Sequence, residues 1–480
     1  MSAQVIVMIL GLVFVIYIAR YLGAEGFGKY SFAVAFTGLF SVVCYFGLNM
    51  LVIRAVSRDK SLAGKYLGSI ILLRVLLSLV TLFLIFTVIN LMGYPEDTKI
   101  IVYIMGLYVV LTAYALLPRS IFQAFEKMEY TALMQVIEKI ILVSLGIYVL
   151  ISGYKLFESE LIAVVSIFLI SALFNLVISF YICIKNFTKP EFEFDKKFWR
   201  HLLKEGFPLA LYVILVPFFF KITIISVSLI EEDVATGMYS AAFNLLIALL
   251  VIPQMFNKAM LPVMSKLFVS GKKSLKFSME KSIKYLFILA FPIAVGIIIL
   301  GDKIILLFYG KEFTDSILVI QILALFLPFR FINFILINSL ISINKQWFVT
   351  ISILVCGVSN VISNLILIPV YGVKGAAIAT VITEILFLIL LFYFVNKFLY
   401  KEFKKDITGY LSSLLKVILG GIIMGVFVYY FKDLELLNIQ IIDLIITVIF
   451  AGLLYFVVLF VLRTFSKQDL NMLKSIKERK

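Results

Sequence analysis

The segment LVPFFFKITIISVSLI, residues 215–230, is apolar along nearly its whole length but carries a lysine, Lys221, near its middle. A run of this length and composition is typical of a helix that crosses a lipid bilayer. A charge at the centre of such a helix costs about 2.5–3.5 kcal/mol on insertion scales. The segment therefore predicts a membrane protein in which Lys221 has a specific task.

The rest of the chain has the same character. Of its 480 residues, 63% are hydrophobic, and the mean hydropathy is +1.12. A soluble protein of this length could not cover so much apolar surface. The apolar runs are too long and too uniform for barrel strands, so we expect an all-α integral membrane protein. Fourteen stretches have spanning length: 3–19, 30–52, 67–92, 100–118, 131–152, 159–183, 207–230, 237–257, 285–308, 316–343, 348–370, 375–396, 411–431 and 439–462.

The net charge of +15 reports topology rather than nucleic-acid binding. With the N-terminus placed in the cytoplasm, thirty of the 43 Lys and Arg residues fall on the cytoplasmic side and eight on the outer side. This bias predicts a multi-pass protein of the cell membrane with both termini in the cytoplasm. Because Met1 leads almost directly into the first span, we expect no cleavable signal peptide.

An internal repeat organises the chain. GKYSFAVAF, from Gly28, resembles GMYSAAFNL, from Gly237, at an offset of 209 residues. Six spans separate the two motifs, so the halves enter the membrane in the same direction, as in transporters built from parallel repeats. The sequence predicts a six-helix lobe over 1–184, a cytoplasmic interfacial linker over 185–206, a second six-helix lobe over 207–400, and two extra helices with a basic tail over 401–480. Phe198, Trp199, Leu202 and Leu203 predict that the linker forms a helix lying on the membrane surface.

Sequence signatures of catalysis are missing from the chain. No Gly-rich phosphate loop, metal-spaced cluster or paired nucleophile is present, so we expect neither an enzyme nor a cofactor. The three cysteines lie far apart in apolar spans, which favours buried thiols over a disulfide framework. The chemistry must therefore come from polar residues inside the spans.

These intramembrane residues are few. Arg74 shares a helical face with Ser78 and Thr81, and Arg330 is spaced to meet Asn333. The remaining candidates are Lys221, Glu138, Lys139, Asn360, Asn364, Glu384 and Lys416. Arg74 has two readings, a functional cation or a snorkelling side chain, and Lys416 reads as a snorkeller. Asn360 and Asn364 read either as sugar ligands or as contacts between helices.

Three stretches carry a resemblance to a known family. They are ARYLGAEGFGKYSFAVAF from Ala19, YGKEFTDSILVIQILAL from Tyr309, and INKQWFVTISILVCGVSNVISNLILIPVYGVKGAAIATVITE from Ile343. Together they resemble polysaccharide transporters of the lipid-linked oligosaccharide flippase type. That resemblance implies the multidrug/oligosaccharidyl-lipid/polysaccharide exporter superfamily, with two lobes in a V around a central cavity that works by alternating access.

The resemblance implies a substrate and roles for particular residues. A flippase of this type would move a polyprenyl-phosphate- or diphosphate-linked oligosaccharide to the outer leaflet, alongside a glycan polymerase or ligase and as a monomer. Lys221, Arg74 and Arg330 would neutralise the phosphate, Asn360 and Asn364 would bind sugar hydroxyls, and Arg20 would lie at the cavity rim. Many family members carry Asp two positions after the basic residue of the seventh span, where this chain has Thr223.

Two further hypotheses accompany the flippase reading. Glu138 and Glu384 are the candidates for binding a coupling H⁺ or Na⁺, because the chain has no nucleotide site. The alternative functions are a multidrug exporter of the same superfamily, a flippase for the lipid-linked peptidoglycan precursor, and a membrane-bound glycosyltransferase. A drug exporter would need an anionic cavity, whereas the deep residues here are mainly cationic.

Overall fold

Helices make up nearly all of the structure, a computed structural model that describes residues 2–152, 159–400, 408–433 and 440–464. No strand occurs in these ranges, which confirms the expected all-α class. The helices are α1 (Ser2–Tyr45), α2 (Leu48–Arg58), α3 (Ala63–Leu91), α4 (Glu96–Ala124), α5 (Met128–Ser152), α6 (Glu160–Asn186), α7 (Lys196–Ile230), α8 (Asp233–Leu249), α9 (Val251–Ser270), α10 (Lys272–Phe308), α11 (Ser316–Ala324), α12 (Phe326–Ser342), α13 (Gln346–Tyr371), α14 (Val373–Val395), α15 (Thr408–Phe431) and α16 (Gln440–Val461).

The helices group into two compact units. Unit 1 contains residues 1–241 and 360–373, and unit 2 contains residues 242–359 and 374–480. The second part of α13 therefore packs with the first half of the chain, as does the start of α8. The lobe boundaries expected from the sequence remain a prediction.

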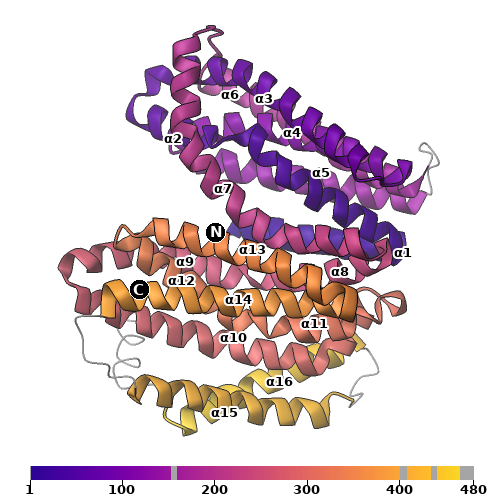
Figure 1. The fold of residues 1–480 in the computed structure, drawn as a ribbon, viewed down its shortest axis with the longest axis vertical. Helices are drawn as coiled ribbons and strands as arrows, with labels where there is room; N and C mark the ends of the chain where they lie inside the picture. The colour runs from indigo at the N-terminus through magenta and orange to yellow at the C-terminus, as the bar shows by residue number, and fades with distance from the viewer. Residues whose placement is uncertain (1, 153–158, 401–407, 434–439, 465–480) are drawn as a thin grey trace. The chain divides into compact units, whose positions relative to one another are not determined.

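Unit 1 is built around α1 and α4 (Figure 1). The helix α1 is interrupted at Gly23, whose φ of 66° and ψ of −176° break the helical path. Glycine adopts a positive φ without the Cβ clash that other residues suffer. The chain can therefore bend at Gly23, between the first and second expected spans, while α1 continues. The helix α4 packs against α1, α2, α3 and α6 and forms the centre of the unit.

The repeated glycines of the two sequence motifs meet within unit 1. A Cβ on Gly28 would lie 1.8 Å from the Asp233 carbonyl oxygen, and one on Gly237 would lie 2.0 Å from the Ala24 carbonyl oxygen. Only glycine permits helices to approach this closely, as small residues do at many membrane helix contacts. The repeat thus has a structural role at the crossing of α1 and α8.

The second part of the polar linker forms a helix, as expected, and its place on a membrane surface remains a prediction. Asp195 caps the start of α7 by accepting hydrogen bonds from the Lys197 and Phe198 amides, and α7 then runs on to Ile230. Leu202 is buried in a cluster formed with α2 and α3, and Phe198 and Trp199 pack against it. The apolar face of this helix therefore packs at least partly on protein.

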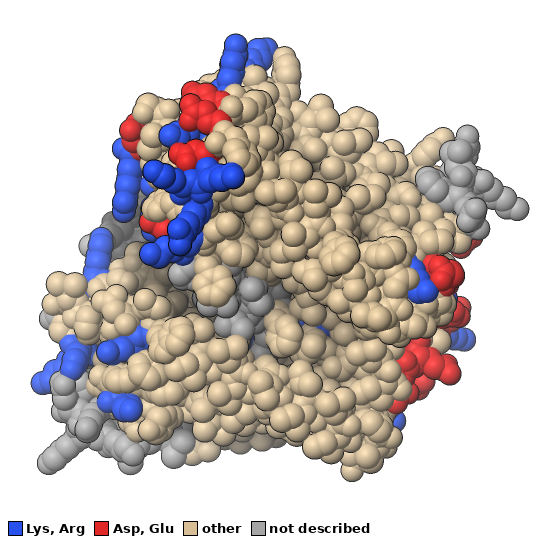
Figure 2. Space-filling view, turned by 45° about the horizontal axis from the view of Figure 1, so that its top comes forward, with Lys and Arg blue, Asp and Glu red and all other residues tan. Residues whose placement is uncertain are grey.

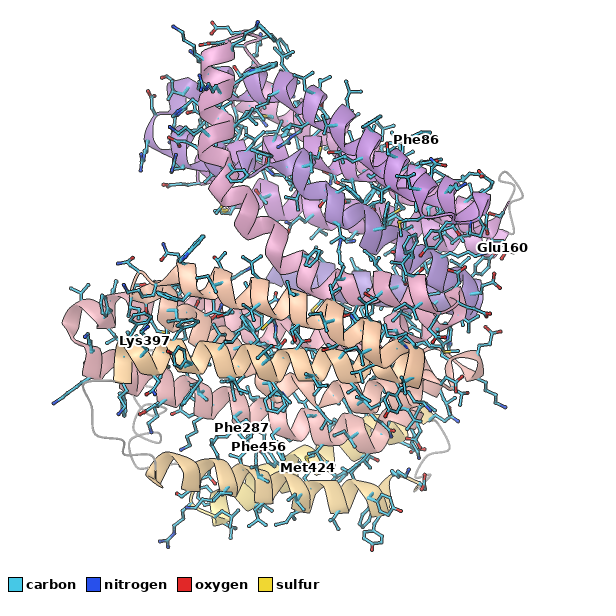
Figure 3. All side chains as sticks on the ribbon, viewed as in Figure 1. Phe86, Glu160, Phe287, Lys397, Met424 and Phe456 are labelled. Atoms are coloured by element: carbon cyan, nitrogen blue, oxygen red, sulfur yellow. The ribbon has the colours of Figure 1, made fainter. Side chains whose placement is uncertain are left out.

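Unit 2 is arranged around the long helix α10. This helix packs against α9, α11, α12 and α15. The helices α11 and α12 form one bent span with a 40° angle, and Pro328 follows the break at a position where its missing amide is harmless. Figure 3 shows Phe287, Met424 and Phe456 where α10, α15 and α16 come together. Buried Met424 and Tyr455 are central to this contact.

The helix flanks are suited to lipid. Exposed apolar side chains such as Phe83, 67% exposed, and Leu365, 60% exposed, cover the helices. Figure 2 shows a broad face of uncharged side chains, with the charged ones gathered toward its edges. Within the described residues, eleven helices are long and apolar enough to span a membrane, or up to twelve with the bent pair.

The expected count of fourteen spans remains a prediction, although most of each expected stretch falls on helix in the described residues. The count of eleven or twelve is lower than fourteen for two reasons. The first two stretches merge into one apolar run, 5–58, and within α7 only Lys221–Ile230 is counted because side chains at 208–217, 219 and 220 lie outside the described set. Because proline lacks the amide that a helix needs, the sequence predicts a kink at Pro217, but its side chain is among those outside the described set.

Candidate functional site

Lys221 lies against α1 in the interior of unit 1. Its Nζ donates a hydrogen bond to the Val34 carbonyl oxygen at 3.3 Å. A Cβ on Gly38 would lie 1.6 Å from that Nζ, so the glycine makes the room that the lysine occupies. The side chain is half-buried, and no carboxylate of the described residues forms an ion pair with it. Lys221 is therefore a cation whose charge is only partly compensated.

Arg74 is the second such cation. Its side chain is fully buried in α3, which contradicts the snorkelling reading, because a guanidinium at 0% exposure does not reach the headgroups. One terminal nitrogen donates to the Ala113 carbonyl oxygen on α4, and the other donates to Asn49 Oδ1 at 3.1 Å. Its Nε has no hydrogen-bond partner among the described residues. The predicted face is confirmed, since Ser78 and Thr81 are buried along the same helix.

The two cations have the same electrostatic problem. Both are bonded to neutral oxygens rather than to carboxylates within the described chain. A buried charge without an opposite charge keeps much of its desolvation cost, which carbonyl dipoles offset only in part. Both also approach the second half of α1 or the residues just after it, Val34 for Lys221 and Asn49 for Arg74. Each of these two cations is therefore suited to an anionic group that reaches it.

Arg330 has a different environment in unit 2. Its Nη1 lies 3.5 Å from Glu384 Oε1, and Asn333 donates to the same oxygen at 2.7 Å. Glu384 is fully buried, and Arg330 is nearly so. The spacing that linked Arg330 to Asn333 thus brings both to one carboxylate on α14. Arg330 and Glu384, expected in separate roles, form one buried cluster.

A matching cluster lies in unit 1, and the sequence analysis missed its arginine. Arg119 Nη2 donates to Glu138 Oε2 at 2.7 Å and to Asn175 Oδ1 at 2.8 Å. Asn175 also donates to the same Glu138 oxygen at 3.1 Å. Glu138 therefore pairs with Arg119 rather than with its neighbour Lys139. Arg119 was assigned to a loop because the expected span ended at residue 118, whereas α4 continues to Ala124.

The internal repeat contains the signal that finds this residue. Arg330 follows Arg119 by 211 positions, and Glu384 follows Asn175 by 209, close to the offset of the glycine motifs. Each unit therefore holds an arginine at a related position, and Glu384 takes the place that Asn175 has in unit 1. The carboxylate and the asparagine come from different helices in the two units, α5 and α6 in unit 1 but α14 and α12 in unit 2. Carrying the offset backward from Arg330 would have identified Arg119.

The asparagine stripe of α13 meets α7. Asn360 Oδ1 accepts hydrogen bonds from Thr223 Oγ1 and from Asn364 Nδ2, each at 2.9 Å. All three side chains are at most 2% exposed. Their geometry matches the interpretation as contacts between helices. Thr223, the departure from the family pattern, belongs to this network, while Asn364 Oδ1 has no partner among the described residues.

The remaining candidates lie at the edges. Arg20 is exposed on α1 before the Gly23 break. Lys139 and Lys416 are half-buried. The three cysteines are buried, as their apolar surroundings predicted.

The fold and the buried charges define a class: an integral membrane protein of many helices with polar clusters inside its spans. The model of the polysaccharide biosynthesis protein family matches residues 1–268, and the chain belongs to this family. The MatE family model also matches, over residues 208–366.

Comparisons with individual proteins agree with this family. The chain is 24% identical to the probable low-salt glycan biosynthesis flippase Agl15 of Haloferax volcanii, over 92% of this chain and 89% of that one. It is 32% identical to an uncharacterized membrane protein of Methanocaldococcus jannaschii over 44% of this chain, and that match spans 39% of the relative's length. Its fold is similar to that of the lipid II flippase MurJ in an inward closed conformation, with a TM-score of 0.77, 22% identity and coverage of 95% and 97% of the two chains.

Proposed function

We propose that this protein is a flippase that moves a polyprenyl-phosphate- or diphosphate-linked oligosaccharide from the cytoplasmic to the outer leaflet for surface glycan synthesis. The observation that carries the proposal is a pair of cations, the buried Arg74 and the half-buried Lys221, that lack a carboxylate partner in the described part of unit 1. The family assignment and the flippase named among the relatives support it. Alternating access is the mechanism that we propose for the movement.

The chemistry of the substrate suits these cations. A phosphate that reaches Lys221 or Arg74 supplies the negative charge that each lacks, and it would be bound more strongly than a neutral group. Arg74 offers a planar guanidinium, and Lys221 offers a mobile point charge. The lipid tail can remain in the bilayer while the protein shields the polar headgroup. We propose secondary sugar contacts for Asn360 and Asn364, and a rim position for Arg20.

Arg330 is part of this proposal through its ion pair with the carboxylate of Glu384. While Glu384 is ionised, the two side chains neutralise one another at 3.5 Å. Protonation of Glu384 would remove the negative charge beside Arg330 and so strengthen the attraction between Arg330 and a substrate phosphate. The buried pair thus links two hypotheses from the sequence, phosphate binding by Arg330 and ion binding by Glu384.

The function is tested in proteoliposomes with a labelled polyprenyl-diphosphate oligosaccharide. We expect label to become accessible to an external glycosidase faster with the protein than in protein-free vesicles. A labelled lipid-linked peptidoglycan precursor and the organic cation ethidium serve as the competing substrates. Flipping of the peptidoglycan precursor alone would favour the activity named for MurJ. Ethidium export alone would favour a drug exporter, the reading that the MatE match supports.

The proposed orientation can be tested by reporter fusions. Because Lys and Arg are concentrated on one side, a reporter fused after Lys273 should read cytoplasmic, and one placed in residues 231–237 should read external. Alkaline phosphatase and green fluorescent protein give opposite signals on the two sides. The same side for both fusions would contradict the proposed topology, including its cytoplasmic termini.

Ion coupling is tested at the two carboxylates. Glu138→Gln and Glu384→Gln keep the shape of each side chain but remove its titratable charge. We expect one variant to lose the dependence of flipping on an imposed pH or Na⁺ gradient, because a buried carboxylate is the group that can bind the coupling ion. Glu280→Gln, on the surface-facing part of α10, is the control. Unchanged gradient dependence in both buried variants would rule out these carboxylates as coupling sites.

A further inference from the structure

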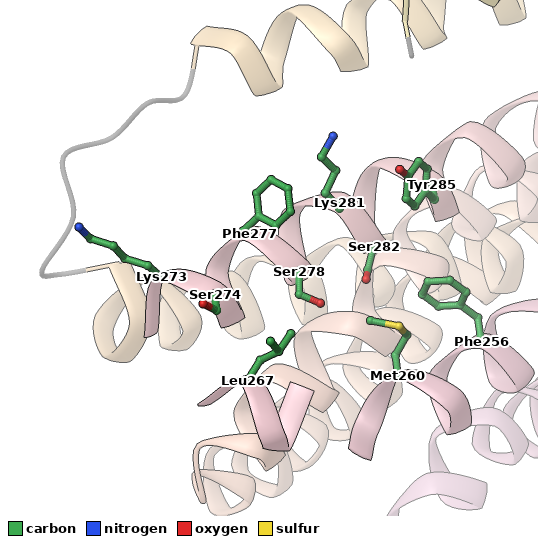
Figure 4. A pocket seen from close by; sticks show the side chains of 10 residues that line it. All are labelled: Phe256, Met260, Leu267, Lys273, Ser274, Phe277, Ser278, Lys281, Ser282 and Tyr285. Atoms are coloured by element: carbon green, nitrogen blue, oxygen red, sulfur yellow. The ribbon is translucent and has the colours of Figure 1, made fainter. Parts of the chain in front are cut away.

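A groove lies between α9 and α10 at the basic end of unit 2 (Figure 4). Its volume is about 660 Å³, within the range of small-molecule sites. One wall is the α9 stripe formed by Phe256, Met260 and Leu267, and the other is a face of α10 that begins at Lys273 and ends at Tyr285. The whole groove lies within unit 2 and is separate from the deep charges of either unit.

The two walls differ in chemistry. The α9 side chains are apolar, whereas α10 contributes Ser274, Ser278 and Ser282 at four-residue spacing, so their hydroxyls share one helix face. Figure 4 shows these serines on the side of α10 toward α9. The groove therefore has an apolar wall on α9 opposite a row of serine hydroxyls on α10 that can form hydrogen bonds.

Positive charge borders the groove. Lys273 and Lys281 both line it, whereas none of its ten lining residues is acidic. The Lys281 Nζ lies 5.6 Å from the centre of the Phe277 ring, which keeps the charge beside the apolar part. The segment 258–284 carries seven lysines and a single acidic residue, Glu280. A ligand that fits must be anionic at one end and apolar at the other.

We propose that this groove binds the phosphate headgroup and upper chains of an anionic membrane phospholipid in the cytoplasmic leaflet. Basic pockets between membrane helices on the cytoplasmic side are suited to such headgroups. Lys273 and Lys281 approach the phosphate, the serine hydroxyls donate to its oxygens, and the α9 wall contacts the acyl chains. The bound lipid would fill the space between α9 and α10. The inference does not depend on which substrate the protein transports.

The experiment uses the full-length protein in detergent. Native mass spectrometry follows the binding of dioleoyl-phosphatidylglycerol, with dioleoyl-phosphatidylcholine as the neutral lipid. We expect one tightly held phosphatidylglycerol that neither phosphatidylcholine nor inorganic phosphate displaces from the wild-type protein. Displacement by inorganic phosphate would show a simple anion site, and preferential replacement by a polyprenyl-diphosphate oligosaccharide would show a substrate site; either result would overturn the proposal.

Variants locate the lipid. The double change Lys273→Gln and Lys281→Gln should weaken phosphatidylglycerol binding by about 30-fold, from two lysines near an anionic lipid. Ser278→Phe should abolish tight binding without changing the charge, because the ring fills the groove. The matched control, Lys258→Gln with Lys266→Gln, removes the same charge from exposed positions of α9 outside the groove. Equal weakening by both lysine pairs, or unaltered binding in Ser278→Phe, would refute the groove as the site.

Discussion

Replacing Lys221 by Met should leave the protein folded and reduce flipping of a lipid-linked oligosaccharide by about 10- to 100-fold, the worth of a hydrogen bond to a charged group. The lysine has no carboxylate partner among the described residues, so its removal leaves no buried anion behind. Loss of a partly compensated charge should keep or raise the melting temperature. Melting in detergent and flipping in proteoliposomes measure the two effects separately.

Lys221→Arg provides the graded variant and Lys416→Met the matched control. Arginine keeps the charge but is larger and planar, and it must fit the space left by Gly38, so we expect partial flipping. Lys416 is half-buried on α15 and takes no part in the proposed site, so its variant should flip at the wild-type rate. A Lys221→Met protein that melts and flips as wild type would remove Lys221 from the mechanism. One that fails to fold would show a structural ion partner.

Replacing Arg119 by Met should have the opposite effect, a loss of about 3–5 kcal/mol of stability, because it leaves Glu138 buried and unpaired. Arg119 is 9% exposed and Glu138 is 14% exposed, so solvent screens their 2.7 Å contact little. The double variant, Arg119→Met with Glu138→Met, should recover most of this loss, since both charges are then gone. Chemical unfolding in mixed micelles gives the free energies for a double-mutant cycle.

Lys139→Met is the control for this cycle. It removes a neighbouring half-buried charge from the same helix without breaking the Arg119–Glu138 pair. We expect its stability to change much less than that of Arg119→Met. Additive effects of the Arg119 and Glu138 changes would contradict the pair as a stabilising unit.

The spanning helices and the internal repeat could be predicted because apolar runs and repeated motifs are both read directly from the sequence. Spanning helices need long apolar runs, and the repeat from Gly28 to Gly237 even marked the two glycines that meet between α1 and α8. The ends of the helices were harder to predict. Apolar character stops near residue 118, yet α4 continues to Ala124, because α4 is held there by packing rather than by lipid. Composition likewise does not distinguish a helix face that meets lipid from one that packs on protein, so the burial of Leu202 against α2 and α3 was not predicted.

The candidate site, like the fold, could be predicted only in part from the sequence. Depth in a span identified Arg74, Lys221 and Arg330 as unusual, but depth cannot say which of them has a partner. That depends on Glu384, 54 residues after Arg330 in the chain, and on carbonyl oxygens that every residue possesses. The geometry therefore separates cations that pair within the protein from cations that remain available. It leaves Arg74 and Lys221 as the residues most suited to an anionic headgroup.

The central claim is that the protein recognises the charge of the lipid phosphate. Its most direct test compares two substrates in the same wild-type proteoliposomes: a polyprenyl-diphosphate oligosaccharide and an uncharged polyprenyl glycoside that bears the same glycan. The account predicts that the charged lipid is flipped at least about tenfold faster, because buried cations favour an anion by more than 1.4 kcal/mol. Equal flipping rates for the two lipids would contradict it.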